Sequence, residues 1–382
     1  MGSLVVTCVL FWHPPISIPP PPPSLLPRTS PSTSAPSSAS SSSRNVATLK
    51  AHRQLASYFA VIKQDLFGLA DVATTLETAV RVATAVVHSG LLESLVNDLA
   101  ALDFEERKDA AQIFGAVVRM KETNPERLGG HYVGVEHPEL LETLLQGYRD
   151  HHTAIACGTM LRDCLRSPGL SAVVASRPSF WQLFDHVLHP AFEVSSDAFS
   201  TLKEVLTREP QDVAPVLGEA GSDAKLLAAY VRLLSSDNYL VKRQSLSLLG
   251  TVFGLPEYAR LALYLGNRLE LLIPIMTLLR DSLRHISYEA LLVFREIIVL
   301  LKTGSLYDEG VLKVLGKNRE RLLGFIRDFQ TDRDMEDEKL PEIRNFICGV
   351  IEAWTPHVDE EGSVSGVRTT IPQVAEPVDR TA

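Results

Sequence analysis

The sequence predicts an all-α protein in which one helical unit recurs along the chain. A small residue is followed by apolar residues four, seven and eight positions later, and this pattern starts at Ala110, Cys157, Ala198, Ser245 and Ala290. The starts lie 47, 41, 47 and 45 residues apart. Offsets of four and seven residues share one helical face. Because a period of about 40–47 residues is typical of armadillo and HEAT arrays, we expect an armadillo/HEAT-like solenoid.

The five helices that carry this pattern each present an apolar face beside a small residue. The small residue lets a neighbouring helix approach closely. The expected faces are, in chain order, Phe114, Val117 and Val118; Leu161, Cys164 and Leu165; Leu202, Val205 and Leu206; Leu249, Val252 and Phe253; and Phe294, Ile297 and Ile298.

Further apolar helices are expected between these five. They lie at Leu91–Val96, Leu140–Leu145, Phe180–Phe184 and Leu269–Met276. Breakers that include Ser167-Pro168-Gly169, Arg177-Pro178-Ser179, Glu209-Pro210 and Gly221-Ser222-Asp223 separate the helices. Only residues 5–12 and 363–372 read as β-prone, and neither segment has a pairing partner in view. The pattern therefore favours helix throughout the repeat region.

The fourth repeat helix has the strongest start signal. Ser236-Asp237-Asn238 precedes it, and side chains of this kind cap helix N-termini. Leu246, Leu249 and Val252 account for its core face. The core does not require the aromatic and basic side chains near the helix start, which are Tyr239, Lys242 and Arg243.

Composition bounds the domain organisation. The chain has 382 residues, of which 45% are hydrophobic, and a formal net charge of −9, which argues against a generic nucleic-acid binder. Proline and serine dominate the start of the chain, so we expect a disordered segment over residues 1–45. The predicted organisation continues with one helical-repeat scaffold domain over 46–355 and a disordered tail over 356–382.

Cysteine usage and hydropathy indicate a cytoplasmic protein. Cys157 and Cys164 are too far apart on one helix for a disulfide, and their spacing suits core packing in a reducing compartment. No segment approaches 18 uninterrupted apolar residues, so no membrane span is expected. The apolar stretch 4–12 lacks the preceding basic residues of a secretory signal.

The sequence offers no convincing active site, cofactor site or metal site. His151 and His152 are adjacent, so they cannot share a metal ion from one helical face, and a solvated helix start explains them better. The acidic run from Asp332 lacks the glycine at position six and the glutamate at position twelve of a calcium loop. Cys157 or Cys164 as a nucleophile would need a positioned base. We therefore expect a protein without enzymatic activity.

Several segments together resemble the Mo-twenty-five-like scaffold family, also called calcium-binding protein 39-like or HymA-like. They occur in family order and cover roughly residues 50–353. The matching segments are 89–92, 103–114, 157–164, 196–199, 206–208, 237–250, 278–281, 289–290 and 293–294. The resemblance implies a curved helical-repeat rod with a concave binding face and no catalytic activity.

The resemblance also implies the partners. Members of this family bind sterile-twenty-type kinases or pseudokinases, hold the kinase regulatory helix in an active position, and act in cell polarity and morphogenesis signalling. A pocket toward the C-terminal end takes a short C-terminal Trp-Glu-Phe-type peptide of the partner. A general helical-repeat adaptor that binds extended peptides, unrelated to kinases, is the alternative function.

Five positions of this chain match partner contacts of the family. By resemblance, Phe192 is a concave-face aromatic, while Tyr239 and Arg243 are an aromatic and a basic kinase contact. Met276 matches a methionine of the peptide pocket, and Lys317 matches a pocket lysine that meets the acid of the peptide. These residue types suit the roles, because aromatics and Arg dominate hot spots and Met lines adaptable grooves. Core packing or surface solvation is the ordinary alternative for each.

The chain departs from the family pattern at three places. Ser247 stands where the family usually has a lysine, and residues 254–259 replace a more basic, aromatic run near the peptide pocket. The family's short N-terminus is also replaced by the Pro/Ser-rich segment. The departures at Ser247 and 254–259 bear on the detailed specificity of the pocket.

Overall fold

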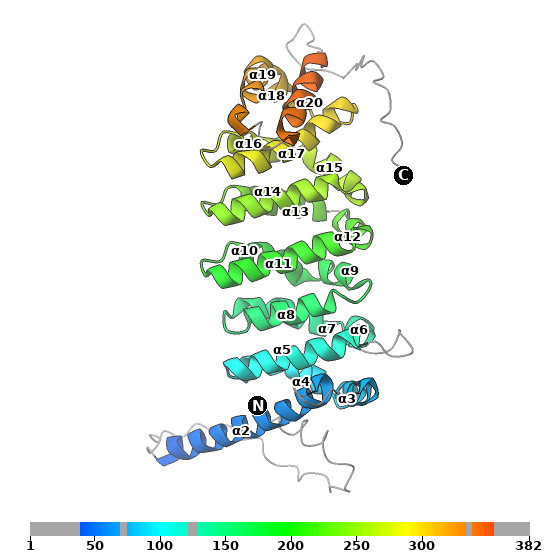
Figure 1. The fold of residues 1–382 in the computed structure, drawn as a ribbon, viewed down its shortest axis with the longest axis vertical. Coiled ribbons are helices and arrows are strands. Elements are labelled where there is room, and N and C mark those ends of the chain that lie inside the picture. Colours follow the sequence, from blue (N-terminus) through cyan, green and yellow to red (C-terminus); the bar gives the residue numbers. More distant parts are fainter. Residues whose placement is uncertain (1–38, 69–74, 121–128, 220, 334–337, 355–382) are drawn as a thin grey trace, which may run out of the picture. The chain divides into compact units, whose positions relative to one another are not determined.

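The structure is a computed structural model that describes residues 39–68, 75–120, 129–219, 221–333 and 338–354 (Figure 1). These residues form helices joined by turns, and none of them belongs to a strand. The chain divides into two compact units, the first ending at Val205 and the second beginning at Leu206. The all-α prediction is confirmed for the described residues.

The first unit contains the helices up to α11. Helix α5 packs against α2 and α8, and α7 packs against α4 and α8. The elements are α2 (Ala39–Phe67), α3 (Leu76–His88), α4 (Leu91–Asn97), η1 (Leu99–Ala101), α5 (Phe104–Arg119), α6 (Gly129–His131), η2 (Tyr132–Glu136), α7 (Glu139–Gln146), η3 (Gly147–Arg149), α8 (Ala154–Cys164), α9 (Leu170–Ala175), η4 (Pro178–Trp181), α10 (Gln182–Val187) and α11 (Phe192–Arg208), which runs across the boundary.

The second unit continues the same alternation. Helix α14 packs against α13 and α17, and α20 packs against α17 and α19. The elements are α12 (Pro210–Leu217), α13 (Ser222–Leu234), α14 (Tyr239–Gly254), η5 (Pro256–Tyr258), α15 (Ala259–Gly266), α16 (Leu269–Leu278), α17 (Arg284–Lys302), α18 (Glu309–Lys317), α19 (Arg319–Arg327), η6 (Thr331–Arg333) and α20 (Lys339–Ala353).

The predicted repeat is confirmed in helices α5, α8, α11, α14 and α17. The small residue that begins each pattern is buried, and so is every apolar residue predicted at offsets four, seven and eight. Burial of these faces supplies the hydrophobic stabilisation that a single repeat cannot provide alone. The recurring sequence pattern therefore marks the core-facing helix of each repeat.

Capping side chains fix where two of these helices begin. The Asn238 side chain accepts hydrogen bonds from the backbone N–H groups of Leu240 and Val241, which confirms the predicted start of α14. In α5, the Asp103 side chain accepts from the Glu106 N–H, while Glu106 accepts from the Asp103 N–H. This reciprocal capping box satisfies two backbone donors that the helix itself leaves unpaired.

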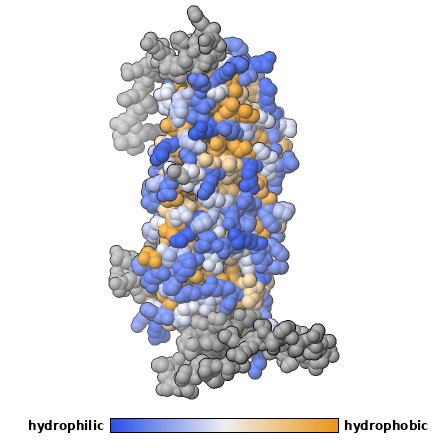
Figure 2. All heavy atoms as spheres, turned by 180° about the vertical axis from the view of Figure 1, so that it is seen from behind, coloured by the Kyte–Doolittle hydropathy of each residue, from blue (hydrophilic) through white to orange (hydrophobic). Residues whose placement is uncertain are grey.

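The sequence predictions for the two chain ends fall largely on residues 1–38 and 355–382, which lie outside the described residues, as do the β-prone segments 5–12 and 363–372. Helix α2 begins at Ala39, within the segment for which disorder was predicted. No single described helix is long and apolar enough to span a membrane. Two bent helix pairs reach the required length and apolar composition only when both helices are counted together, and they are Leu76–His88 with Leu91–Asn97 and Pro256–Gly266 with Leu269–Leu278. In Figure 2, hydrophilic side chains cover much of the visible face, with apolar side chains between them.

Candidate partner-binding surface

One face of α14 presents an aromatic and a basic side chain outward. Tyr239, Arg243 and Ser247 follow one another at intervals of one helical turn, and all three are exposed. Tyr239 is 36% exposed at the first position of the helix. The structure thus brings Tyr239 and Arg243 together on one surface of the second unit, as expected for residues four apart on a helix.

Helix α17 supplies polar neighbours for this surface. The side chain of Ser247 hydrogen-bonds with Glu289, and the charge of Arg243 also acts on the Glu289 carboxylate. Burial raises the pKa of Glu289 above its ordinary value, against the lowering effects of Ser247, Arg243 and His285. Beside this group, Lys242 Nζ lies 3.6 Å from Asp281 Oδ2. Ser247, which stands where the family usually has a lysine, is therefore the hydrogen-bond partner of an acidic residue, Glu289.

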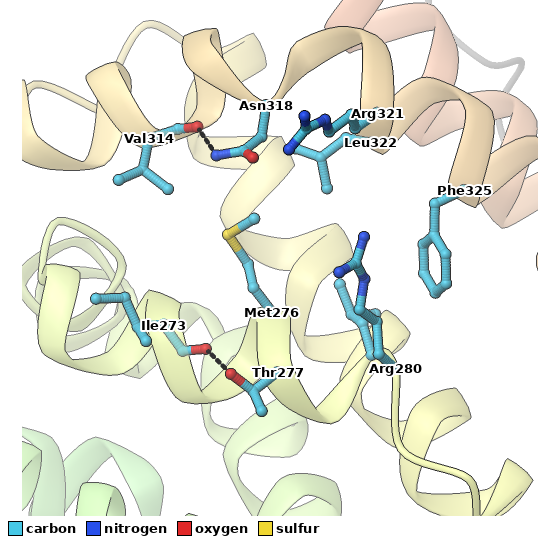
Figure 3. A pocket seen from close by; sticks show the side chains of 10 residues that line it. Ile273, Met276, Thr277, Arg280, Val314, Asn318, Arg321, Leu322 and Phe325 are labelled. Atoms are coloured by element: carbon cyan, nitrogen blue, oxygen red, sulfur yellow. Dashed lines mark hydrogen bonds between the residues drawn. The ribbon is translucent and has the colours of Figure 1, made fainter.

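A cavity of about 530 Å³ lies beside Met276 in the second unit (Figure 3). Residues from α16, α18 and α19 and from the turn after α16 surround it. Its lining consists of Ile273, Met276, Thr277, Leu279, Arg280, Val314, Asn318, Arg321, Leu322 and Phe325. Clefts of about 300–1,000 Å³ with mostly apolar linings are typical ligand sites, so this volume suits one or two large side chains.

Two arginines give the cavity its charge. Thr277 Oγ1 donates to the Ile273 carbonyl at 2.9 Å, and Asn318 Nδ2 donates to the Val314 carbonyl at 2.8 Å. Arg280 and Arg321 are exposed at the cavity, and the Arg280 guanidinium lies 5.7 Å from the centroid of the Phe325 ring. Because the other polar side chains bond to their own helices, the arginines are the groups suited to an acidic ligand.

The structure places the other predicted contacts differently. Met276 lines the cavity, whereas Lys317 does not. Lys317 is exposed at the end of α18, directly before the lining residue Asn318. Phe192 is exposed at the first position of α11, in the first unit. Within the second unit, Tyr239 and Arg243 lie on α14, while Met276 lies on α16.

Sequence reasoning missed the cavity arginines and Glu289 as site residues. Arg280 and Glu289 both stand in segments that carry the family resemblance, at 278–281 and 289–290. Arg321 follows Lys317 by four residues, but a break at Asn318 separates α18 from α19. The chain spacing alone therefore did not indicate which of the two cations enters the cavity.

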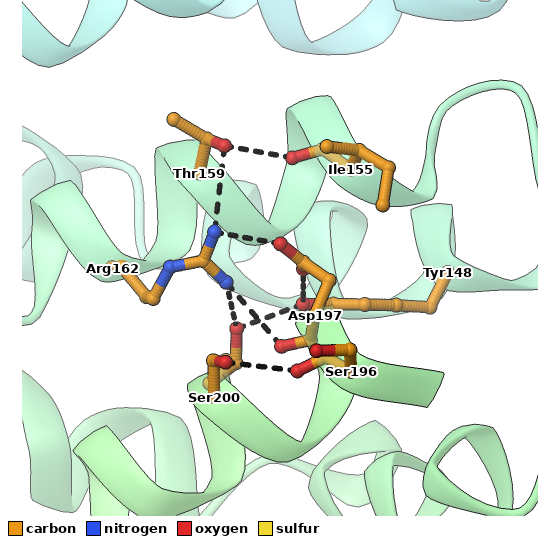
Figure 4. A network of polar contacts seen from close by, with 8 residues as sticks. Tyr148, Ile155, Thr159, Arg162, Ser196, Asp197 and Ser200 are labelled. Atoms are coloured by element: carbon orange, nitrogen blue, oxygen red, sulfur yellow. Dashed lines mark hydrogen bonds and ion pairs between the residues drawn. The ribbon is translucent and has the colours of Figure 1, made fainter. Parts of the chain in front are cut away.

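A buried polar network accounts for another matching segment, 157–164 (Figure 4). Arg162 Nη2 donates to Asp197 Oδ1 at 2.7 Å, and the Tyr148 hydroxyl donates to Asp197 Oδ2 at 2.6 Å. Thr201 accepts from Arg162 Nη1 at 2.7 Å. Burial, reinforced by Asp197, holds the pKa of Tyr148 well above its usual range. The network joins α8 to α11 and is satisfied internally, which suits a structural role.

Cys157 and Cys164 are core residues, as predicted. Cys157 and Cys164 are buried and free. Burial raises the pKa of the Cys157 thiol to about 12, and it raises the pKa of Cys164 for the same reason. A raised pKa suppresses the thiolate that nucleophilic chemistry needs. Their burial therefore favours packing over reactivity.

Two groups of side chains bring possible metal ligands within 4.8 Å of one another, Asp150 with His151 and His152, and His52 with Asp103 and Glu106. His151 and His152 lie in the turn before α8 and not on one helical face, with their ring centroids 3.8 Å apart. Both rings are exposed, as predicted. Capping and ion-pair contacts account for the second group.

The sequence profile described as Mo25-like matches residues 30–354, which is most of the chain. The chain belongs to the Mo25-like family. The match spans both compact units of this Mo25-like chain and includes the α14 surface, the Met276 cavity and the Arg162–Asp197 network. Family membership makes it a scaffold protein whose partners are other proteins.

Relatives of the Mo25-like chain occur in distant organisms. The degreening-related gene dee76 protein of Auxenochlorella protothecoides is 37% identical over 278 residues, 73% of this chain and 84% of the relative. Calcium-binding protein 39-like of Mus musculus is 33% identical over 305 residues, 78% of this chain and 86% of the relative. The conidiophore development protein hymA of Emericella nidulans is 29% identical over 332 residues, 79% of this chain and 84% of the relative.

Two engineered proteins are among the solved structures that match this chain. One engineered protein has a TM-score of 0.47 at 15% identity and covers 79% of this chain and 71% of its own. A designed armadillo repeat protein in complex with the peptide (KR)4 has a TM-score of 0.40 at 13% identity, covering 64% of this chain and 93% of its own.

Proposed function

We propose that this scaffold binds and allosterically activates a sterile-twenty-type kinase or pseudokinase. The support is family membership together with the exposed aromatic and basic side chains of α14. A scaffold activates a kinase when it binds the active conformation more tightly than the inactive one, since a ligand shifts a conformational equilibrium by its differential affinity. We place the kinase contacts at Phe192, Tyr239 and Arg243, with the first in one unit and the other two in the second.

The α14 surface has the chemistry of an interaction hot spot. Tyrosine offers a large apolar ring with a polar tip, and arginine offers a planar fork of donors. Both residue types are enriched among the side chains that dominate binding energy. Glu289 beside Arg243 adds a carboxylate to this surface, so a partner must match an acceptor as well as a cation.

We also propose that a C-terminal Trp-Glu-Phe-type peptide of the partner binds in the cavity beside Met276. Its lining combines apolar and aromatic side chains with Arg280 and Arg321. The apolar part suits the aromatic rings of such a peptide, and either guanidinium suits its glutamate or terminal carboxylate. We assign the acid-binding role to these arginines in preference to Lys317, which lies outside the lining but remains a candidate contact at the rim.

A peptide-binding titration tests this assignment. A labelled peptide ending in Trp-Glu-Phe is titrated with the full chain, and fluorescence anisotropy gives its Kd. Met276→Ala and, separately, Arg321→Glu should each weaken binding by about tenfold or more, which corresponds to about 1.4 kcal/mol. Lys313→Ala is the matched control, because Lys313 is exposed on α18 but does not line the cavity. Equal affinities of all the folded proteins would contradict the assignment.

The alternative function is a general helical-repeat adaptor that binds extended peptides without any kinase. The cavity alone fits both functions, because either peptide class offers apolar and acidic groups. Identification of co-purified proteins by mass spectrometry separates them. A sterile-twenty-type kinase supports the scaffold proposal, whereas unrelated proteins that share one peptide motif would support the adaptor.

The cellular setting is part of the same proposal. We place the protein in the cytoplasm, in cell polarity and morphogenesis signalling, because the proposed kinase partners act there and the buried free cysteines suit a reducing compartment. Deletion of the gene should then disturb cell shape or cell separation. Imaging of a tagged chain together with its kinase tests the location, and exclusive recovery outside the cytoplasm would contradict it.

A further inference from the structure

The turn between η3 and α8 brings three possible metal ligands together. Asp150, His151 and His152 each offer one ligand atom, and these atoms all lie within 4.8 Å of one another. His151 Nδ1 lies 3.8 Å from Asp150 Oδ1, and the two imidazole ring centroids are also 3.8 Å apart. All three residues are exposed. An ion from solvent can therefore reach the three side chains without any opening of the fold.

The backbone of this turn is what allows adjacent histidines to converge. On an α-helix, successive side chains point about 100° apart. In the turn, the backbone N–H groups of Thr153 and Ala154 both donate to the Asp150 carbonyl at 3.0 Å. The His152 N–H donates to Asp150 Oδ1 at 2.9 Å, and Thr153 Oγ1 donates to the Gly147 carbonyl at 2.7 Å. The objection to two ligands from one helical face therefore does not apply here.

The ring nitrogens of both histidines are available to a ligand. Among the described residues, no hydrogen bond engages a ring nitrogen of His151 or His152, and the 3.8 Å approach to Asp150 is too long for one. The other group of possible ligands differs in this respect. There, His52 Nδ1 lies 2.8 and 2.7 Å from the two carboxylate oxygens of the buried Glu106. Only the turn before α8 therefore combines convergence with free nitrogen donors, within the part of the chain that the structure describes.

The ligand types select the class of ion. Imidazole nitrogens with a carboxylate suit Zn²⁺, Cu²⁺ and Ni²⁺, whereas Ca²⁺ and Mg²⁺ take oxygen ligands. Zinc binds such atoms at about 2.0–2.2 Å, and its tetrahedral geometry then separates two ligand atoms by about 3.3 Å. Rotation of the exposed side chains is enough to bring the three atoms to that separation. A carboxylate has two oxygens, so Asp150 can bind the ion and still accept the His152 N–H.

We propose that Asp150, His151 and His152 bind one divalent transition-metal ion of the Zn²⁺ class, with water in the fourth coordination position. Two neutral imidazoles supply the nitrogens, and the carboxylate supplies the negative charge. The positive end of the α8 dipole lies close by and opposes a cation, and the charge of Asp150 offsets this effect. The site involves neither the α14 surface nor the Met276 cavity, so it does not depend on the kinase proposal.

Calorimetric titration of the full chain with Zn²⁺, and separately with Ca²⁺, tests the site. The ligand variant is His151→Ala with His152→Ala, which removes both nitrogen donors. The matched control is His88→Ala with His285→Ala, because it removes two exposed imidazoles outside the turn. We expect the wild type and the control to bind one equivalent of Zn²⁺ more tightly than Ca²⁺, and the ligand variant to bind Zn²⁺ at least about tenfold more weakly.

A spectroscopic measurement identifies the ligands directly. Electron paramagnetic resonance of the protein with one equivalent of Cu²⁺ should show coupling to two imidazole nitrogens in the wild type and the control, and this signature should be lost in the ligand variant. Circular dichroism without metal checks that all three proteins are folded. The inference is overturned if the wild type binds no Zn²⁺, if it binds Ca²⁺ as tightly as Zn²⁺, or if the folded ligand variant titrates like the control.

Discussion

At the scale of single residues, Gly158 shows why a matching segment of this chain tolerates little change. A Cβ atom at this position would lie 1.8 Å from Asp197 Oδ2 and 2.2 Å from the Tyr148 hydroxyl. Because glycine has no side chain, Asp197 and the Tyr148 hydroxyl can occupy this space and form the polar network between α8 and α11. Arg162 and Thr201 complete the network. Glycine is required here by close approach and not by backbone conformation.

We expect Gly158→Ala to destabilise the protein by about 3 kcal/mol, because overpacking forces the partly buried Asp197 carboxylate away from its donors. Chemical denaturation followed by circular dichroism measures the change in the free energy of unfolding. Gly324→Ala in α19 is the control, since no atom lies within 4 Å of its added Cβ. That variant should be neutral or more stable by up to about 1 kcal/mol. A Gly158 variant as stable as the Gly324 variant would refute the steric argument.

At the scale of elements, α14 is positioned by a cap at its start and by α17 along its side. The Asn238 side chain bonds two backbone N–H groups of the first turn, directly beside Tyr239. Ser247 with Glu289 links α14 to α17, and Lys242 with Asp281 links α14 to the turn before α17. The cap and these contacts fix the orientation of α14, so Tyr239 and Arg243 can be replaced without loss of the fold.

Removal of the cap should destabilise α14. We expect Asn238→Ala to lower the free energy of unfolding by about 1 kcal/mol, since an unsatisfied N-cap costs roughly that amount. Thermal unfolding of the two proteins provides the comparison. Asn238→Ser should restore most of the loss, because serine also accepts a hydrogen bond from the first turn. Equal losses in the alanine and serine variants would argue against a capping role.

The half-buried Glu289 should make stability depend on pH. Its pKa is raised, so the folded protein binds the proton more tightly than the unfolded chain, and stability falls as the pH rises from the ordinary carboxyl pKa through the raised value. Glu289→Gln removes this penalty. Thermal unfolding between about pH 4 and pH 8 should show a variant that gains on the wild type toward neutral pH. A difference that grows instead toward acidic pH would have the wrong sign.

The repeat could be predicted from the sequence, whereas the cavity could not. In every repeat, the small residue and the apolar residues four, seven and eight positions later are buried because they face the core. This local pattern was therefore enough to locate α5, α8, α11, α14 and α17. The cavity depends on how the turn after α16 meets α18 and α19. That meeting brings together Arg280 and Arg321, which are 41 residues apart in the chain, and it leaves Lys317 outside the lining.

At the scale of the whole molecule, the chain is a Mo25-like scaffold with two compact units, and each unit has a candidate surface of its own. The first unit carries Phe192, and the second carries the α14 surface and the Met276 cavity. Contacts distributed over separate surfaces can raise overall affinity through effective concentration when one partner engages them together. Substitutions in one unit should therefore lower the overall affinity for a partner that contacts both units.

Co-purification of a kinase with the full chain tests the central proposal most directly. Tagged wild type, the Tyr239→Ala, Arg243→Ala variant and a Thr251→Ala control, exposed two turns beyond Arg243 on α14, are purified and bound proteins are quantified by mass spectrometry. We expect wild type and control to retain a sterile-twenty-type kinase or pseudokinase and the double variant, equally stable to heat, to lose about tenfold or more of it. A folded double variant that retains the kinase at the wild-type level, or a wild type that retains none, would contradict this account.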